Sequence, residues 1–336
     1  MPDAIAASRE AFAALKSGGI AAPPRVHLVE DDRTTLLMGA AGGDVGRIAK
    51  VVNVFPGNRT RGVPVTNGLV LVLDPETGAV VGMCCGATLT AIRTGAVAGL
   101  ATDLLAREGA RVGAVIGAGA QARTQLLAMA AVRDLREVRV FAPRPERVAT
   151  FVAEMSPQVS CKLVAVSSGS AAVDGADVVS LATSSPQPVV LGDDLELGAH
   201  LNGVGSFRLD MHEVDIRAVD RCDRIVVDLR ESALHEAGEL VAGVSAGVTA
   251  SDQWVELGEL LADPSLGRRK PDDITFFKSV GHAVQDLYSA RRAMVNAEAL
   301  GLGQLLEGLP GQQDARPLGP TLRASAHGMV RTARGH

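Results

Sequence analysis

The sequence predicts an α/β protein in which a doubly wound parallel sheet is joined to a discontinuous α+β domain. From residue 110 to residue 285, short apolar runs alternate with helical segments, which is the pattern of a parallel sheet covered by helices. Between residues 25 and 85, strand-like runs follow one another with only turns between them. The chain has 336 residues, more than one hydrophobic core usually organises, so two domains are expected.

The elements of the first domain follow from local patterns. Helical spacing of apolar residues covers the first 25 residues and breaks at Pro23-Pro24. Strands are then expected at residues 26–28, 34–38, 48–52 and 69–73. The segment 74–78 reads Asp-Pro-Glu-Thr-Gly, a turn signal between apolar strands that predicts a hairpin. A long Ala- and Leu-rich helix is expected at 89–106.

The parallel sheet is expected to contain strands 112–116, 138–141, 162–166, 177–181, 200–204, 225–228 and 274–277. A final helix at 286–300 is expected to return to the first domain, which makes that domain discontinuous. The predicted domains are therefore residues 1–108 with 287–306, and residues 109–286. Residues 307–336 have no apolar period and are expected to form a mobile extension.

Composition narrows the class of protein. Hydrophobic residues make up 47% of the chain and aromatic residues only 3%, so the core is expected to consist of Val, Leu, Ile and Ala. A net charge of −5 argues against nucleic acid as a partner. The sequence has no apolar segment long enough to span a bilayer and no signal-like N-terminus, so a cytoplasmic enzyme without a membrane partner is expected.

Cysteine and histidine residues do not predict a metal site. Cys84 and Cys85 are adjacent, and Cys161 and Cys222 stand alone, so the spacing suits neither zinc nor an easy disulfide. The seven histidines form no ligand set either. Reduced thiols without a chemical role, and no metal, are expected.

The motif Gly-Ala-Gly-Ala-Gln-Ala at residues 117–122 is the most informative part of the chain. An apolar strand precedes it and a helix-forming segment follows it directly. Gly117 permits a tight turn, Gly119 lets the backbone approach a pyrophosphate, and Ala122 lets the helix pack closely on the strand. Ala120 and Gln121 lie at the helix start, where backbone N–H groups and the helix dipole attract phosphate. A dinucleotide cofactor on a Rossmann-type domain is therefore predicted.

The next strand favours NADP over NAD. NAD-specific sites usually place an acidic residue at the end of that strand, where it accepts hydrogen bonds from the ribose 2′-OH. The sequence has no acid there, and Arg144 and Arg147 follow in the loop. A guanidinium suits the charge of a 2′-phosphate. The alternative is that both arginines belong to a solvated helix start with Glu146 as their partner, in which case NAD remains the cofactor.

Several ordered motifs resemble those of the ornithine cyclodeaminase/μ-crystallin family across about residues 20 to 305. They include KVVNVFPGN at 50–58, GVP at 62–64, LTAIRT at 89–94, the glycine motif, and FKSVG at 277–281. The resemblance implies a homodimer built by the first domain, a Rossmann-type second domain, and a small α-imino or α-amino acid substrate held between them.

The resemblance also implies roles for individual residues. Arg25 and Lys50 match carboxylate-binding cations, and Lys50 is the expected proton donor in catalysis. Glu231 matches a pocket acid, although an exposed acid at a helix start explains it equally well. Val280 is expected to line the substrate pocket. The cofactor is expected to contact Thr66 (one position from the family's threonine), Arg93, Gly117, Gly119, Ala120, Gln121, Arg144, Thr183, Val204 and Ser279.

One departure from the family pattern decides between activities. The family's cyclodeaminases carry an Asp where this chain has Phe207, and phenylalanine cannot accept a proton. Asp210 substitutes for it only if the loop is rebuilt. The sequence therefore favours an NAD(P)-dependent oxidoreductase that reduces Δ1-pyrroline-2-carboxylate or Δ1-piperideine-2-carboxylate by hydride transfer to the α-carbon. The alternatives are an alanine-type amino-acid dehydrogenase, an ornithine cyclodeaminase, and an NADPH-dependent binding protein similar to μ-crystallin.

Overall fold

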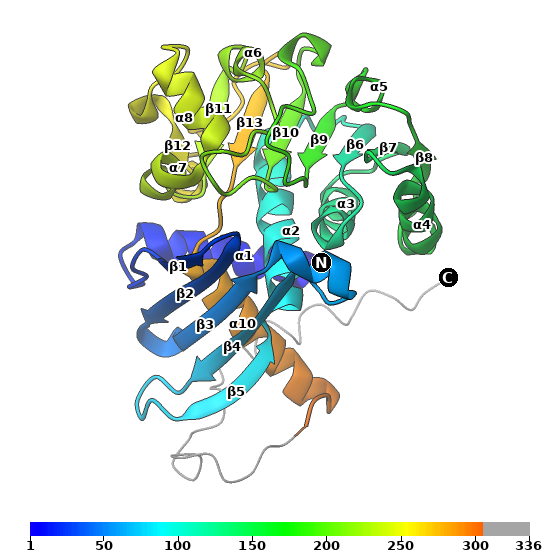
Figure 1. Cartoon of the computed structure of the whole chain (residues 1–336). Helices are drawn as coiled ribbons and strands as arrows, with labels where there is room; N and C mark the ends of the chain where they lie inside the picture. The colour runs from blue at the N-terminus through cyan, green and yellow to red at the C-terminus, as the bar shows by residue number, and fades with distance from the viewer. Residues whose placement is uncertain (305–336) are drawn as a thin grey trace, which may run out of the picture. The chain divides into compact units, whose positions relative to one another are not determined.

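The computed structural model describes residues 1–304 and divides them into two units (Figure 1). Unit 1 comprises Met1–Lys16 and Ala91–His282, and unit 2 comprises Ser17–Thr90 and, among the described residues, 283–304. The boundaries of these two units differ from the domain boundaries expected from the sequence. Residues 1–16 and 91–108 belong with the parallel sheet, because their helices contribute to its core. The mobile extension expected at 307–336 lies outside the described residues.

Unit 1 contains an eight-stranded sheet in the order β12-β11-β13-β10-β9-β6-β7-β8, and all of its pairings are parallel. The sequence order reverses between β6 and β9, the position at which such folds bind their ligands. All seven predicted strands are present, and the two-residue edge strand β12 was not predicted. The strands are β6 (Val112–Ile116), β7 (Glu137–Phe141), β8 (Lys162–Ala165), β9 (Val178–Leu181), β10 (His200–Gly203), β11 (Arg224–Val227), β12 (Val255–Glu256) and β13 (Thr275–Lys278).

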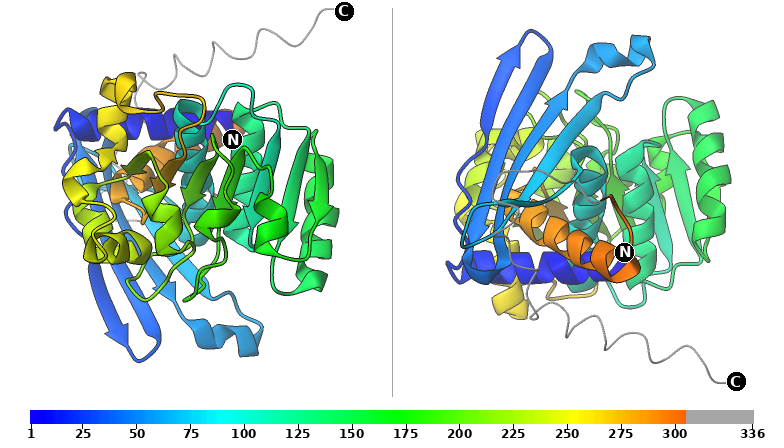
Figure 2. Two further views of the ribbon diagram at one scale, coloured as in Figure 1. Left: turned by 90° about the horizontal axis from the view of Figure 1, so that it is seen from above. Right: turned by 90° about the horizontal axis from the view of Figure 1, so that it is seen from below.

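Helices cover both faces of this sheet (Figure 2). Neighbouring strand residues point to opposite faces, so Phe276 and Phe277 enter different apolar cores. One face packs against α5 (Gly169–Val173), α6 (Ile216–Asp220), α7 (Arg230–Glu236) and α8 (Gly238–Ser245). The other packs against α1 (Pro2–Lys16), α2 (Gly86–Leu105), α3 (Ala120–Val132), α4 (Pro145–Met155) and α9 (Leu257–Ala262). Among residues 1–304, no helix has both the length and the apolar character needed to cross a membrane.

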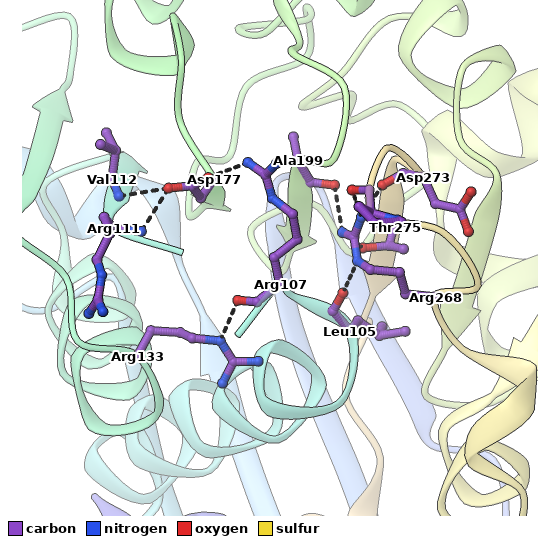
Figure 3. Close-up of polar contacts among 11 residues, drawn as sticks. Leu105, Arg107, Arg111, Val112, Arg133, Asp177, Ala199, Arg268, Asp273 and Thr275 are labelled. Atoms are coloured by element: carbon purple, nitrogen blue, oxygen red, sulfur yellow. Dashed lines mark hydrogen bonds and ion pairs between the residues drawn. The ribbon is translucent and has the colours of Figure 1, made fainter. Parts of the chain in front are cut away.

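Buried and half-buried charges hold the amino ends of the strands together (Figure 3). Asp177, just before β9, accepts hydrogen bonds from the backbone N–H groups of Arg111 (2.7 Å) and Val112 (2.9 Å) at the start of β6. Arg107 pairs with the same carboxylate. At the same edge of the sheet, Arg268 donates to the carbonyl oxygens of Leu105 (2.6 Å) and Ala199 (3.3 Å). This edge of the sheet is therefore structural, and the carboxyl edge carries the loops predicted to bind ligands.

Unit 2 is an antiparallel meander in the order β1-β2-β3-β4-β5, with α10 (Ala283–Leu300) packed on one face. Its strands are β1 (Val26–Glu30), β2 (Arg33–Gly42), β3 (Gly46–Val54), β4 (Thr66–Leu73) and β5 (Val80–Cys85). The predicted hairpin at 74–78 is confirmed. The Asp74 carboxylate accepts hydrogen bonds from the backbone N–H groups of Glu76 (3.0 Å) and Thr77 (2.8 Å), which closes the turn between β4 and β5.

A histidine is buried within the parallel sheet. The ring nitrogens of His200 lie 2.9 Å from Thr275 Oγ1 and 3.1 Å from Asn202 Oδ1, and Asn202 donates to Thr102 Oγ1 (2.9 Å). Burial, together with the positive charge of Arg268, lowers the pKa of His200 to about 3. The imidazole is therefore neutral in the folded protein over the whole physiological range.

Because His200 is neutral in the folded protein, we expect the free energy of unfolding to fall in acid. Because the pKa is lower in the folded state than in the unfolded state (6.5), the unfolded protein binds an extra proton between pH 6.5 and 3. The stability contributed by His200 is complete above pH 6.5 and falls as pH decreases, by about 2 kcal/mol at pH 5. Urea unfolding at pH 7 and pH 5 measures it. His200→Gln should flatten this dependence, whereas the exposed control His235→Gln should not. Equal slopes in both variants contradict the assignment.

Candidate functional site

The predicted phosphate-binding turn joins β6 to α3. Gly117 has φ +123°, and a Cβ at this position would lie 2.6 Å from the Ala182 carbonyl oxygen, so only glycine fits. Gly119 caps α3 without a side-chain hydrogen bond, and a Cβ placed on it would meet nothing within 4 Å. Ala120 and Gln121 begin the helix. Open space in front of uncapped helix N–H groups fits the pyrophosphate of a dinucleotide.

Arg144 lies at the start of the neighbouring helix. It is the N-cap residue of α4, and both Arg144 and Arg147 are exposed. Within residues 1–304, neither guanidinium forms a hydrogen bond or ion pair with Glu146. The alternative in which Glu146 neutralises these arginines therefore finds no contact in its favour.

Four predicted site residues follow three adjacent strands at the carboxyl edge of the sheet. Thr183 follows β9, Val204 follows β10, and Ser279 and Val280 follow β13. Ser279 and Val280 are buried, and Val204 is 9% exposed. The Thr183 hydroxyl donates to Glu213 (3.0 Å) and the Ser279 hydroxyl to Asp228 (2.9 Å). Both hydroxyls are therefore engaged by the protein itself.

Arg93 joins this group within unit 1. It lies on α2 and is 5% exposed. A Cβ added to Gly281, which has φ +89°, would lie 2.8 Å from a nitrogen of its guanidinium. Arg93 therefore packs against the backbone directly after Ser279 and Val280.

Lys50 is the central charge of unit 2. It lies on β3 and is 2% exposed. Its ammonium donates to Asp286 Oδ1 on α10 (2.6 Å) and to Thr90 Oγ1 (2.7 Å). The Thr90 hydroxyl donates its own proton to the Gly86 carbonyl oxygen (2.6 Å), so it acts as an acceptor toward Lys50. These contacts hold Lys50 as a charged ammonium in an otherwise apolar core.

Arg25 is set on the same side of the sheet as Lys50 by strand register. Val26 pairs with Leu37, and Met38 pairs with Lys50. Extended by one residue, this register places Arg25 opposite Met38 and two strand spacings from Lys50, roughly 10 Å. Thr66 begins β4 and pairs with Val54, four residues along β3 from Lys50, or about 13 Å.

Of the other residues considered in the sequence, Glu231 and Asp210 lie at the surface. Glu231 is exposed in the first turn of α7, a position that agrees with the plain explanation of an acid at a helix start. Phe207 is half-buried. Asp210 is exposed, and hydrogen bonds from Arg208 lower its pKa below the usual range. In this loop, Asp210 is engaged by Arg208, so it does not replace the base that Phe207 lacks.

Three buried carboxylates in this arrangement were not predicted from the sequence: Glu213, Asp228 and Asp286. In the sequence, each of these acids stands next to an apolar residue, and this was the only sign that it could be buried. Burial, together with the charge of Asp286, raises the pKa of the Cys84 thiol to about 11, so this thiol is protonated at neutral pH. Among residues 1–304, no group of three His, Cys, Asp or Glu side chains is placed to hold a metal ion.

Comparison with known proteins identifies the family. The sequence model of the ornithine cyclodeaminase/mu-crystallin family matches residues 1–300. The chain belongs to this family. A Delta(1)-pyrroline-2-carboxylate reductase of Bacillus cereus is 36% identical over 259 residues, 77% of this chain and 79% of the relative. The resemblance inferred from the ordered motifs is thereby confirmed.

Two solved structures share the fold over almost the whole chain. The Thermococcus litoralis Delta(1)-pyrroline-2-carboxylate reductase in complex with NADH and L-proline has a TM-score of 0.87 and 34% identity, covering 90% of this chain and 95% of that one. An archaeal alanine dehydrogenase dimer with bound NAD has a TM-score of 0.84 and 31% identity, covering 91% and 94%. The predicted α/β class with a Rossmann-type parallel sheet is confirmed, and a pyridine nucleotide is the cofactor class of these family members.

Proposed function

We propose that this chain is an NAD(P)H-dependent reductase of small cyclic ketimine carboxylates, converting Δ1-pyrroline-2-carboxylate or Δ1-piperideine-2-carboxylate to proline or pipecolate. The observation that carries the proposal is the buried Lys50 ammonium, held by Asp286 and Thr90. The similarity to the reductase bound to NADH and L-proline, over 90% of the chain, supports it. The 36% identity to a second reductase of the same substrate supports it as well.

In this proposal the substrate groups come from unit 2. Arg25 binds the substrate carboxylate, for which the guanidinium offers two parallel hydrogen bonds. Lys50 donates a proton toward the imine nitrogen, which makes the C=N bond a better hydride acceptor at the α-carbon. Asp286 keeps Lys50 oriented and charged before the reaction. Transfer of one proton and one hydride converts the imine to an amine.

The proposed cofactor groups come from unit 1, except for Thr66, which begins β4 of unit 2. A reduced nicotinamide, when bound, supplies the hydride. The glycine turn and the start of α3 would hold the pyrophosphate. Arg93, Thr183, Val204 and Ser279 belong to loops and a helix that would surround the nicotinamide half. Val280, next to Ser279, and Glu231, in the first turn of α7, would also line the substrate side.

An alanine-type amino-acid dehydrogenase is the second candidate, favoured by the similarity to the archaeal alanine dehydrogenase. It would use the same cations on an open-chain keto acid with ammonia. Ornithine cyclodeamination is disfavoured, because Phe207 offers no base and Asp210 is paired with Arg208. A binding protein similar to μ-crystallin would bind NADPH and turn over none of these imines.

Turnover of the imine should depend on Lys50. Purified protein should oxidise reduced nicotinamide in the presence of Δ1-pyrroline-2-carboxylate, and Lys50→Met should lower kcat by about 10²- to 10⁴-fold because the proton donor is lost. Absorbance at 340 nm measures the rate. The matched control Lys162→Met changes a lysine with an exposed side chain on β8 and should be indistinguishable from the unmodified chain. Ammonia release from ornithine without any imine reduction would establish the cyclodeaminase in place of the reductase.

We propose NADP as the preferred cofactor, because Arg144 and Arg147 are exposed beside the end of β7 where an NAD-selective acid is missing. Loss of a charge-assisted contact to the 2′-phosphate should raise the KM for NADPH by about tenfold or more in Arg144→Ala, with the KM for NADH unchanged. The control is Arg136→Ala, an exposed arginine of the same unit. Steady-state kinetics with both nucleotides decide the matter, and an equal rise for NADH argues against selection by Arg144.

We propose that unit 2 forms a homodimer through the outer face of its sheet. A single cross-strand row on this face contains only exposed residues, namely Val26, Leu37, Val51, Leu69 and Cys85. A continuous apolar row on a sheet face is typical of a protein interface. Every copy of the chain carries this apolar sheet face, so the faces of two copies can pack against each other. The dimer in the alanine dehydrogenase structure supports this choice of partner.

Light scattering after gel filtration tests the dimer. The unmodified chain should have twice the 34.7-kDa mass of one copy. Leu37→Lys places a charge in the apolar row and should shift the protein to monomer. Leu197→Lys, at an equally large but isolated exposed leucine of unit 1, should leave the mass unchanged. A monomeric unmodified protein, or a dimer that survives Leu37→Lys, refutes this interface.

A further inference from the structure

Glu213 connects two loops at the carboxyl edge of the parallel sheet. Its Oε1 accepts hydrogen bonds from the backbone N–H (2.7 Å) and the hydroxyl (3.0 Å) of Thr183, which follows β9. Its Oε2 accepts hydrogen bonds from the backbone N–H groups of Gly205 (2.8 Å) and Ser206 (3.1 Å), which follow β10. The side chain is fully buried. One carboxylate therefore satisfies four donors, two from each loop.

The close approach of the two loops depends on glycine. A Cβ at Gly205 would lie 2.0 Å from the Thr183 carbonyl oxygen and 2.5 Å from Glu213 Oε1. No other residue fits this position without moving one loop away from the other. The sequence Gly-Ser at 205–206 and the carboxylate at 213 thus form one structural unit with Thr183.

A buried ion pair lies next to Glu213. Lys278 on β13 pairs with Glu239 Oε1 (2.9 Å) and donates to the Ser206 carbonyl oxygen (2.8 Å). The Ser206 hydroxyl donates to Glu239 (3.0 Å). Burial raises the pKa of Glu213, while the nearby charge of Lys278 opposes the shift. Three of the four donors to Glu213 are backbone N–H groups, which can only donate, so these contacts fit the ionised form of the carboxylate.

We propose that Glu213 is a positioning residue that fixes the loops after β9 and β10, and thereby aligns the nicotinamide half of the cofactor site; this rests on the proposed function. Both loops carry predicted cofactor contacts, Thr183 and Val204. Glu213 itself has every carboxylate contact directed to the protein, so it acts through the loops. Glutamine is the informative replacement, because its amide keeps one acceptor oxygen and sets an NH₂ group against backbone donors.

Cofactor binding and kinetics of Glu213→Gln test the proposal. The dissociation constant of the nucleotide, measured by fluorescence titration, should rise by about tenfold or more, since hydrogen bonds to a charged group are lost at both loops. The imine KM should change less than twofold, because Arg25 and Lys50 lie in unit 2. Glu213→Asp keeps the charge but is one methylene shorter, and should recover part of the affinity. The control Glu196→Gln changes an exposed glutamate of the same unit.

Hydrogen exchange on the unmodified chain gives a test that requires no variant. Without nucleotide, the amides of Thr183, Gly205 and Ser206 should be protected, because they donate to a buried carboxylate. Rapid exchange of all three, or equal nucleotide affinity of Glu213→Gln and the unmodified chain, overturns the role of Glu213. The readouts are independent of the substrate. If nucleotide affinity falls as expected and no imine is reduced by the unmodified chain, the proposed reaction is wrong and the role of Glu213 stands.

Discussion

The buried ion pair between Lys50 and Asp286 is the constraint on which the organisation of unit 2 depends. A lysine ammonium in an apolar core is strongly unfavourable unless a carboxylate faces it. Lys50 lies on β3, and its partner comes from α10, 236 residues later in the chain. The last helix must therefore pack on the small sheet, which makes this unit discontinuous. The same pair keeps a proton on the side chain that we propose as the acid of the reaction.

Buried carboxylates have a related task at the carboxyl edge of the parallel sheet. Asp228 Oδ2 accepts hydrogen bonds from the Ser279 hydroxyl (2.9 Å) and from the backbone N–H groups of Val280 (3.0 Å) and Gly281 (2.7 Å). Glu213 does the same for the loops after β9 and β10. Each loop that would contact the nicotinamide is thus held in place by hydrogen bonds to a buried carboxylate. Such support is what precise hydride transfer requires.

The sequence predicted the parts of this molecule that local pattern specifies. The seven main strands, the hairpin at 74–78 and the turn at Gly117 follow from apolar runs and from residues with special backbone freedom. The return of the last helix to the first domain was predicted, but the side-chain contacts between distant segments were not. Asp286 was treated only as the first residue of the last helix. Glu213 follows the loop around Phe207, which was considered only for the absence of a base. Residues 1–16 were assigned to the wrong unit, because helical spacing shows that a face is apolar but not which sheet covers it.

Isotope labelling would show whether hydride is transferred to the α-carbon of a cyclic imine. The protein would be incubated with Δ1-pyrroline-2-carboxylate and reduced nicotinamide carrying deuterium at both C4 positions, and the product examined by NMR. We expect the proline to carry deuterium at the α-carbon only. Unlabelled proline, or no proline from the imine under either nucleotide, would contradict it.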